Sequence, residues 1–495
     1  MDRKWWTLIA VNVGIFMLLM DITVVNVALP DIQRELHASF DDLQWVVNAY
    51  ALSLAALLLT AGSIADLFGR RRLFAIGLVI FTAASMTCGL SSGPLMLNVA
   101  RAVQGVGGAI MLATSLALIA GAFRGRDRGI AFGVYGAVIG AAVAVGPVVG
   151  GALTAGIGWE WIFFVNVPIG VVALALTLTR VDESRDPQAT GVDWLGLVTF
   201  SGGLFLLVFG LTQANEAGWG STQTVACLGG AALLLLAFLY VEQRQTRPMF
   251  DLTLLRVPSF AGVSLLTVAM SASMFAMFLY LTLYIQNVLG YGPLQAGLRF
   301  LPLSLVSFVV APFAGRLTVR MPVRWLLSGG LLLVAGGLAL MSGITASSGW
   351  TALLPGFLVA GIGIGMANPA IASTAVGVVP HQRSGMASGV NNTCRQVGLA
   401  TGVAALGAVF QHELVARLPG AAAGGGALAA RPQGVPSHAF HAAFAGALHE
   451  ILLIAAATAL VGALAGLLLV RSRDFVGAQP PVRAADAEPV AEPAG

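Results

Sequence analysis

Long apolar runs separated by short polar segments fill almost the whole chain of 495 residues. A run of about 18–25 apolar residues is long enough to cross a lipid bilayer as a helix. The chain contains fourteen such runs. Eight come first: Thr7–Leu29, Leu43–Ala65, Leu73–Leu90, Leu95–Phe123, Ile130–Ile157, Trp161–Thr179, Trp194–Gln213 and Thr222–Val241. Six follow: Phe260–Leu289, Ala296–Leu317, Val323–Ile344, Leu353–Val379, Gly385–Phe410 and Glu450–Val470. The pattern predicts an all-α polytopic membrane protein.

The basic residues test this count. If the N-terminus is cytoplasmic and the fourteen helices alternate, 20 of the 26 Lys and Arg residues fall on the cytoplasmic side. The exceptions are three residues outside and three within spans: Arg34, Arg417, Arg431, Arg101, Arg299 and Arg395. An excess of Lys and Arg in cytoplasmic loops is typical of membrane proteins, and one helix more or fewer would disrupt it downstream. We therefore expect both termini in the cytoplasm.

Composition narrows the class of protein. Hydrophobic residues make up 57% of the chain and charged residues 10%, against about 25% charged in soluble domains. The net charge of +4 reflects membrane orientation, so no nucleic-acid partner is expected. Arginine replaces lysine almost everywhere and Ala and Gly are abundant, which indicates a high-GC bacterium and its plasma membrane.

The scarcity of lysine bears on the energy source. Lys4 is the only lysine, so a phosphate-binding Gly-x4-Gly-Lys-Ser/Thr loop is absent. The chain by itself is therefore not an ATP-driven pump. We expect a monomer without a cofactor or enzymatic activity, which runs on an ion gradient or downhill on its substrate.

Two polar linkers divide the chain. They predict an N-terminal six-helix half (1–180), linkers carrying two additional central helices (181–258) and a C-terminal six-helix half (259–474). An outer loop (411–449) that contains His438, His441 and His449, and a disordered cytoplasmic tail (475–495), are also expected. A weak repeat relates Gly62–Leu73 to Gly315–Leu326. Paired halves around a midplane site are an architecture of alternating access.

One carboxylate lies deep within the first span. Asp21 is surrounded in sequence by apolar residues, and a charge at that depth costs about 2.5–3.5 kcal/mol on insertion scales. Arg101 in the fourth span lies at a similar predicted depth. If the two face each other, the opposed influences of a cation and of desolvation suit a carboxyl that binds and releases a proton. A purely structural Asp21–Arg101 pair is the alternative.

Five motifs carry a resemblance to a known family. In chain order they are Asp21-x4-Asn26-x3-Pro30, Gly62-x3-Asp66-x2-Gly69-Arg70-Arg71-Arg72, Arg101-x2-Gln104-Gly105-x-Gly107-Gly108, Gly140-x5-Gly146-Pro147-x2-Gly150-Gly151 and Trp159-Glu160-Trp161-x4-Asn166-x-Pro168-x-Gly170. Together they resemble the fourteen-helix drug:proton antiporters of the major facilitator superfamily. The family usually has Arg where Glu160 stands. The resemblance is strong over the first six helices and weaker over the last six.

The resemblance implies the major facilitator fold and proton-coupled export of small amphipathic drugs or antibiotics. It assigns proton coupling to Asp21 and Arg101. It also assigns a cytoplasmic gate to the loop after the second helix and a path-closing seam to the fifth helix. The gating loop comprises Gly62, Asp66, Gly69 and Arg70, and the antiporter motif Gly140, Gly146, Pro147, Gly150 and Gly151.

Polar residues within the spans are candidates for a substrate cavity. They are Asn26, Gln104, Arg299, Asn391 and Arg395. The two arginines either bond backbone carbonyls or touch substrate. The gating loop could instead be a tight turn that only fixes orientation. A uniporter or symporter for a small metabolite, or a sensor that does not transport, is the alternative to an exporter. The natural substrate is not encoded in these motifs.

Overall fold

The computed structural model describes residues 2–38, 40–185, 193–245, 250, 252–318, 320–380, 383–418 and 436–475, without the side chains of a few helical residues such as Asn26 and Pro147. These residues are almost entirely helical and form no β-strand. The first helices are α1 (Arg3–Glu35), α2 (Phe40–Phe68), α3 (Arg70–Gly89), α4 (Pro94–Ala122), α5 (Gly125–Gly156), α6 (Trp161–Phe164) and α7 (Asn166–Arg180). The next two are α8 (Trp194–Ala217) and α9 (Thr222–Arg244). The last are α10 (Pro258–Met270), α11 (Ala276–Leu283), α12 (Pro293–Leu317), α13 (Val323–Met341), α14 (Leu354–Gly377), α15 (Ser384–Arg417) and α16 (Ser437–Leu469).

Each of the fourteen predicted spans corresponds to one helix or to helices in direct continuation. The sixth span is α6 followed by α7. The ninth joins α10 to α11 through the π-helical segment Ser271–Phe275, and a second π-helical segment, Tyr284–Val288, ends it. Thirteen stretches of the described residues are long and apolar enough to cross a membrane, and α5 corresponds to the remaining predicted span. The chain is therefore an all-α multi-pass protein.

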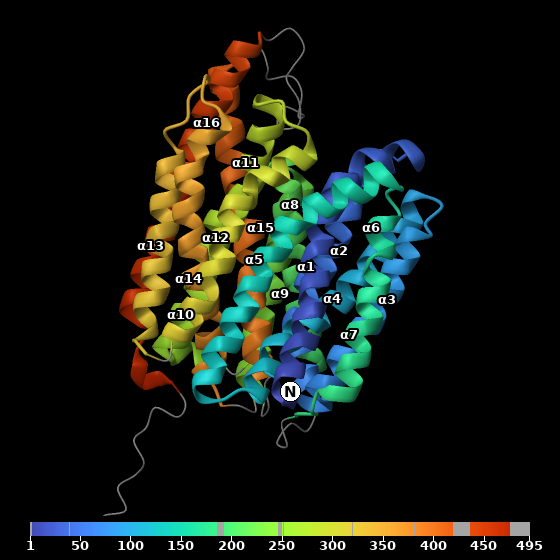
Figure 1. Cartoon of the computed structure of the whole chain (residues 1–495), viewed down its shortest axis with the longest axis vertical. Helices are drawn as coiled ribbons and strands as arrows, with labels where there is room; N and C mark the ends of the chain where they lie inside the picture. Colours follow the sequence, from blue (N-terminus) through green and yellow to red (C-terminus); the bar gives the residue numbers. More distant parts are fainter. Residues whose placement is uncertain are drawn as a thin grey trace, which may run out of the picture.

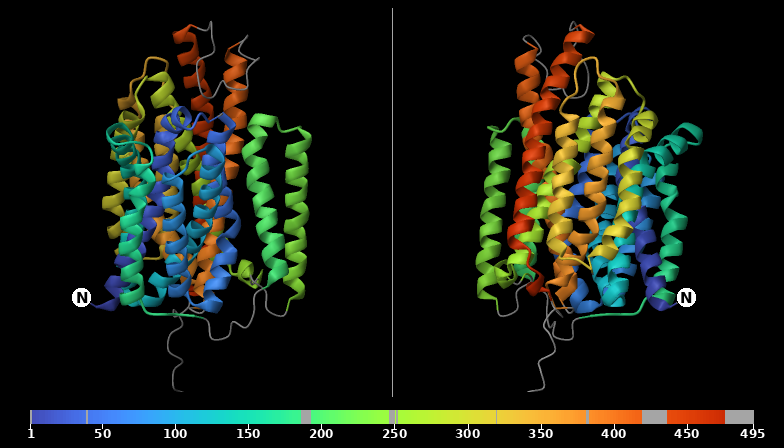
Figure 2. Two further views of the ribbon diagram at one scale, coloured as in Figure 1. Left: turned by 90° about the vertical axis from the view of Figure 1, so that its right-hand side faces the viewer. Right: turned by 60° about the vertical axis from the view of Figure 1, so that its left-hand side comes forward.

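The helices form two bundles with a helix pair beside them (Figures 1 and 2). In one bundle α4 packs on α2 and α3, and α1 packs on α5 and α7. In the other, α13 packs on α14 and α16, and α10 packs on α15 and α16. The bundles meet where α5 contacts α12 and α14 and where α2 contacts α15. Of the separate pair, α8 contacts α2 and α15, while α9 packs mainly on α8.

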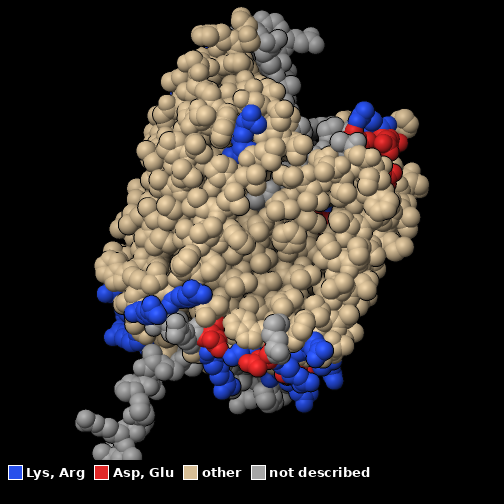
Figure 3. All heavy atoms as spheres, in the orientation of Figure 1, with Lys and Arg blue, Asp and Glu red and all other residues tan. Residues whose placement is uncertain are grey.

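Basic side chains gather at one end of the molecule. Figure 3 shows Lys and Arg concentrated at the end where α1 begins, below a wide band almost free of charge. We call this the basic end. There the hydrophobic core of the first bundle also includes Val376 of α14, Val379 after it, and Met386 and Ala387 of α15. The two bundles are therefore joined through apolar contacts at the basic end.

The predicted outer loop 411–449 is wrong at both ends. Helix α15 continues to Arg417 and α16 begins at Ser437, so His438, His441 and His449 lie on a helix and not in a loop. Rings of the two helices pack in this region, with Phe410 and Phe444 centroids 4.8 Å apart. The apolar runs were too short to indicate these extensions, because contacts between two helices stabilise them beyond the lipid-spanning length. Of the predicted tail 475–495, only Phe475 is among the described residues.

Candidate functional site

Asp21 and Arg101 meet in the interior of the first bundle. The Arg101 Nη1 donates to Asp21 Oδ2 at 2.6 Å, and the two residues are only 1–2% exposed. The prediction that α1 and α4 bring them to the same depth is confirmed. Helix α1 runs on to Glu35, beyond the predicted end of the span at Leu29, so Asp21 lies farther from the end of its helix than that span implies.

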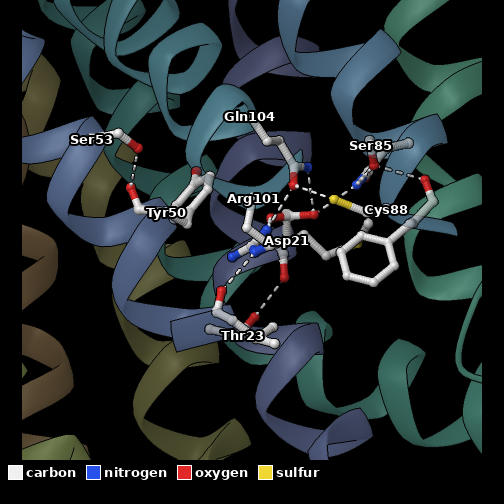
Figure 4. A network of polar contacts seen from close by, with 12 residues as sticks. Asp21, Thr23, Tyr50, Ser53, Ser85, Cys88, Arg101 and Gln104 are labelled. Atoms are coloured by element: carbon white, nitrogen blue, oxygen red, sulfur yellow. Dashed lines mark hydrogen bonds and ion pairs between the residues drawn. The ribbon is translucent and has the colours of Figure 1, made fainter. Parts of the chain in front are cut away.

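Two amides complete the environment of the carboxylate. Asp21 Oδ1 accepts hydrogen bonds from Gln104 Nε2 at 3.0 Å and Asn166 Nδ2 at 2.9 Å. Figure 4 shows Asp21 among Arg101, Gln104, Cys88 and Ser85. Because a buried charge is tolerable only when it is paired and hydrogen-bonded, these donors explain how an apolar bundle accommodates a carboxyl group at Asp21.

Arg101 also has partners other than the carboxylate. Its Nη1 donates to Gln104 Oε1 at 2.8 Å, and its Nε donates to the Val46 carbonyl at 3.0 Å. Its guanidinium lies 4.2 Å from the centroid of the Tyr50 ring. These contacts hold the arginine in place independently of the charge on Asp21.

The carboxylate of Asp66 connects the two bundles at the basic end. Arg70 donates to Asp66 Oδ1 through Nε at 2.9 Å and Nη2 at 2.8 Å. The backbone N–H groups of Gly385 and Met386, at the start of α15, donate to Asp66 at 3.1 and 2.9 Å. An acid at a helix N-terminus also interacts favourably with the helix dipole. Gly62 allows this approach, since a Cβ there would lie 2.6 Å from the Gly385 carbonyl oxygen.

A linker residue that the sequence analysis did not single out caps α3. Glu183 accepts hydrogen bonds from the N–H groups of Arg71 and Arg72 at 3.0 and 3.2 Å. Gly69 lies beside this carboxylate with φ of 111°, a conformation that suits glycine. The loop between α2 and α3 is therefore held by a segment that follows the first bundle. Only the polar character of the linker hinted at this contact.

The glycines of α5 lie against two different helices. Gly146 and Gly150 face Thr23 and Val24 of α1. On the other side, Gly140 faces Ser307 and Gly151 faces Leu294, both in α12. Small residues here allow close helix packing within the first bundle and between the bundles. The side chain of Pro147 lies outside the described residues.

The residues predicted for a substrate cavity come from both bundles. The Asn26 side chain lies outside the described residues, and Gln104 is fully buried against Asp21 and Arg101. Arg299 donates to the Gln295 carbonyl at 2.8 Å and lies 3.3 Å from the Tyr291 ring centroid. Gln104 and Arg299 are each bonded within their own bundle, and a substrate cavity that contains both stays a prediction.

Asn391 and Arg395 share a face of α15. Asn391 Oδ1 accepts a hydrogen bond from Thr267 at 3.0 Å, whereas its buried Nδ2 has no partner among the described residues. The electrostatic neighbour of Arg395 is the side chain of Tyr135 on α5, across the interface between the bundles. Tyr135 in turn shares a hydrogen bond of 3.1 Å with Ser115.

The chain is similar to known transport proteins. Residues 11–403 match the model of the Major Facilitator Superfamily. The chain is 38% identical over 414 residues to the multidrug resistance protein Stp of Mycobacterium tuberculosis, covering 83% of this chain and 77% of that protein. It is 35% identical over 488 residues to the tetracenomycin C resistance and export protein of Streptomyces glaucescens. This match covers 93% of this chain and 90% of that protein. The structure of the human organic anion transporter MFSD10 has the same fold as this chain, with a TM-score of 0.63 at 15% identity. The match covers 93% of this chain and 100% of that one.

Proposed function

This chain belongs to the major facilitator superfamily of membrane transporters and to its drug-efflux family, and from that premise we propose that it exports small amphipathic drugs or antibiotics in exchange for protons. It does so by alternating access, as a monomer in the bacterial plasma membrane. The names of its relatives, a multidrug resistance protein and an antibiotic export protein, support this direction and substrate class.

One observation carries the proposal of proton coupling. The Asp21 carboxylate of α1 is almost fully buried and lies in direct contact with Arg101 of α4. Ionisable residues within membrane spans are costly and commonly serve transport. In this role Asp21 binds the proton and Arg101 modulates its release. Arg101 keeps its contacts with Val46 and Gln104 when Asp21 is neutral, so the arginine does not lose every partner during the cycle.

The distribution of arginine supports a cytoplasmic location for the basic end and for both termini. In that orientation Asp66, with Gly62, Gly69 and Arg70, forms a gate that holds the cytoplasmic ends of the bundles together. The glycines of α5 form the seam along which the bundles close. Release of both sets of contacts would open the cytoplasmic side.

The substrate path in this proposal runs between the bundles. Asn391 and Arg395 are its candidate polar contacts, because both belong to α15, which packs on α2 and α4 of the opposite bundle. Apolar walls suit amphipathic compounds, whose charge must leave water to enter. Protons supply the energy, and no cofactor is required.

Drug accumulation in cells with and without the protein tests this function. Export lowers the accumulation of ethidium and of tetracenomycin-like aromatic antibiotics, and a proton uncoupler restores it. Export that is insensitive to the uncoupler would contradict proton coupling. Accumulation that is raised by the protein would instead favour an importer, and an unchanged level across a drug panel would favour a sensor.

A further inference from the structure

Asn166 is a buried amide with only one end bonded. It is the first residue of α7 and is completely inaccessible to solvent. Its Nδ2 donates to Asp21 Oδ1 at 2.9 Å and to Ser85 Oγ at 3.0 Å. Its Oδ1 has no hydrogen-bond partner among the described residues. An unpaired buried acceptor is unfavourable, so this arrangement calls for a physical reason.

The neighbouring amide of Gln104 is bonded at both ends. Its Nε2 donates to Asp21, and its Oε1 accepts from Arg101 at 2.8 Å and from the Cys88 thiol at 3.7 Å. Turning this amide over would place its NH2 group against the guanidinium of Arg101. Gln104 is therefore locked as a donor to Asp21, whereas Asn166 is free to reverse.

We propose that Asn166 is a positioning residue that reverses its amide each time Asp21 gains or loses a proton. This inference rests on the proposed proton coupling. When Asp21 is a carboxylate, Asn166 presents its NH2 group, as the structure has it. When a proton from water adds to Oδ1, that oxygen becomes a donor and needs an acceptor. Asn166 then turns its Oδ1 toward the new O–H group.

Ser85 makes this reversal possible by exchanging one hydrogen bond for another. Its hydroxyl now accepts from Asn166 and donates to the Phe163 carbonyl at 2.9 Å. A hydroxyl can donate or accept by rotation, so Ser85 can turn from the Phe163 carbonyl and donate its one proton to the reversed Asn166. In both states one end of the Asn166 amide has two partners and the other has none. Asn166 thus keeps two partners in both protonation states of Asp21, and the Ser85 bond to the Phe163 carbonyl is given up in the protonated one.

An isosteric pair of variants tests this role. Asn166→Thr keeps a group that both donates and accepts, while Asn166→Val has the same shape with neither ability. The assay is transport of the monocationic dye ethidium in proteoliposomes, driven by a pH gradient, compared with ethidium counterflow at equal pH. Counterflow exchanges dye for dye and needs no change in the protonation of Asp21. Asn12→Val is the control, since Asn12 is a buried asparagine of α1 that also has an unpaired Oδ1.

We expect Asn166→Val to lose about tenfold of gradient-driven transport while counterflow stays within about twofold of wild type. Asn166→Thr should recover most of the loss, and Asn12→Val should resemble wild type in both assays. Equal losses in both assays, for Thr and Val alike, would reduce Asn166 to a packing residue and overturn the inference. So would a Val variant that transports like wild type.

The same assays distinguish a wrong role for Asn166 from a wrong proposal of proton coupling. Wild-type protein that shows counterflow but no gradient-driven transport would overturn proton coupling and the inference with it. Wild-type protein that couples to the gradient, together with unaffected Asn166 variants, would overturn the inference alone.

Discussion

Two buried aspartates of the first bundle have similar kinds of partner, but their partners belong to different parts of the molecule. Asp21 and Asp66 are each paired with an arginine, and each accepts two further N–H donors. All donors to Asp21 come from side chains of the same bundle. Two donors to Asp66 are backbone groups of α15 in the other bundle.

Under the proposed function, this difference gives each acid a separate part in the transport cycle. Relative movement of the bundles leaves every contact of Asp21 intact, so its state is changed by a proton. The same movement must break the contacts between Asp66 and α15, so its state is changed by conformation. In the proposed function, one acid therefore senses the ion and the other holds the gate. The predictions below test this division.

The largest effect is expected for Asp21→Asn. Removal of the ionisable group should lower gradient-driven export about a hundredfold or more, the range for loss of an essential proton-transfer group. Ethidium counterflow should persist, because the fold and the gate are untouched. Proteoliposomes with and without a pH gradient measure both. A variant that still exports ethidium at the wild-type rate would show that Asp21 is only a structural partner of Arg101.

Gly62→Leu should obstruct the gate by steric means. Its Cβ would lie 2.6 Å from the Gly385 carbonyl oxygen, and overpacking of this kind costs about 1–3 kcal/mol. We expect turnover to fall about tenfold or more, with counterflow falling in parallel because the bundles no longer close. The control is Gly336→Leu in α13, where a Cβ meets nothing within 4 Å. Equal behaviour of the two variants would argue against closure at Gly62.

Asp66→Ala should have a smaller effect, because the apolar contacts at the basic end remain. Loss of the acceptor for Gly385 and Met386 should slow turnover about five- to tenfold, with substrate affinity nearly unchanged. Transport rates and equilibrium ethidium binding separate these two quantities. Glu413→Ala is a matched control, since Glu413 also pairs with an arginine four residues away, but at an exposed site of α15. An unchanged rate for Asp66→Ala would leave the loop with the role of a tight turn.

The smallest effect concerns charge in the other bundle. Arg395 has an electrostatic neighbour, Tyr135, in the opposite bundle, and in the proposed path its positive charge would repel a dicationic dye. Wild-type protein should transport the dication propidium more slowly than ethidium, and Arg395→Leu should raise the propidium-to-ethidium ratio about threefold. Arg299→Leu is the control, because Arg299 is stacked on Tyr291. Propidium transport as fast as that of ethidium in the wild type would indicate a second carboxylate in the path.

The sequence alone determined the membrane-spanning architecture and the location of the chemistry. Crossing lipid requires a minimum apolar length, and a charge within such a run is costly, so both leave a local pattern. The fourteen spans, the pairing of Asp21 with Arg101 and the loop at Asp66 could all be inferred from such patterns. The glycine motif of α5 likewise indicated close helix approach, although not which helices Gly146 and Gly140 contact.

Only the tertiary structure decided the partners. The donors to Asp66 from α15 are backbone N–H groups, which every residue except proline possesses, so no sequence pattern marks Gly385 or Met386. Asn166 and Glu183 bond groups that are far away in sequence, and their roles depend on how α7 and the following linker pack. Gln104 was predicted to contact substrate, but its amide is used up by Asp21 and Arg101. A hydrogen bond depends on position to within a fraction of an ångström, and that precision arises only when the helices have packed.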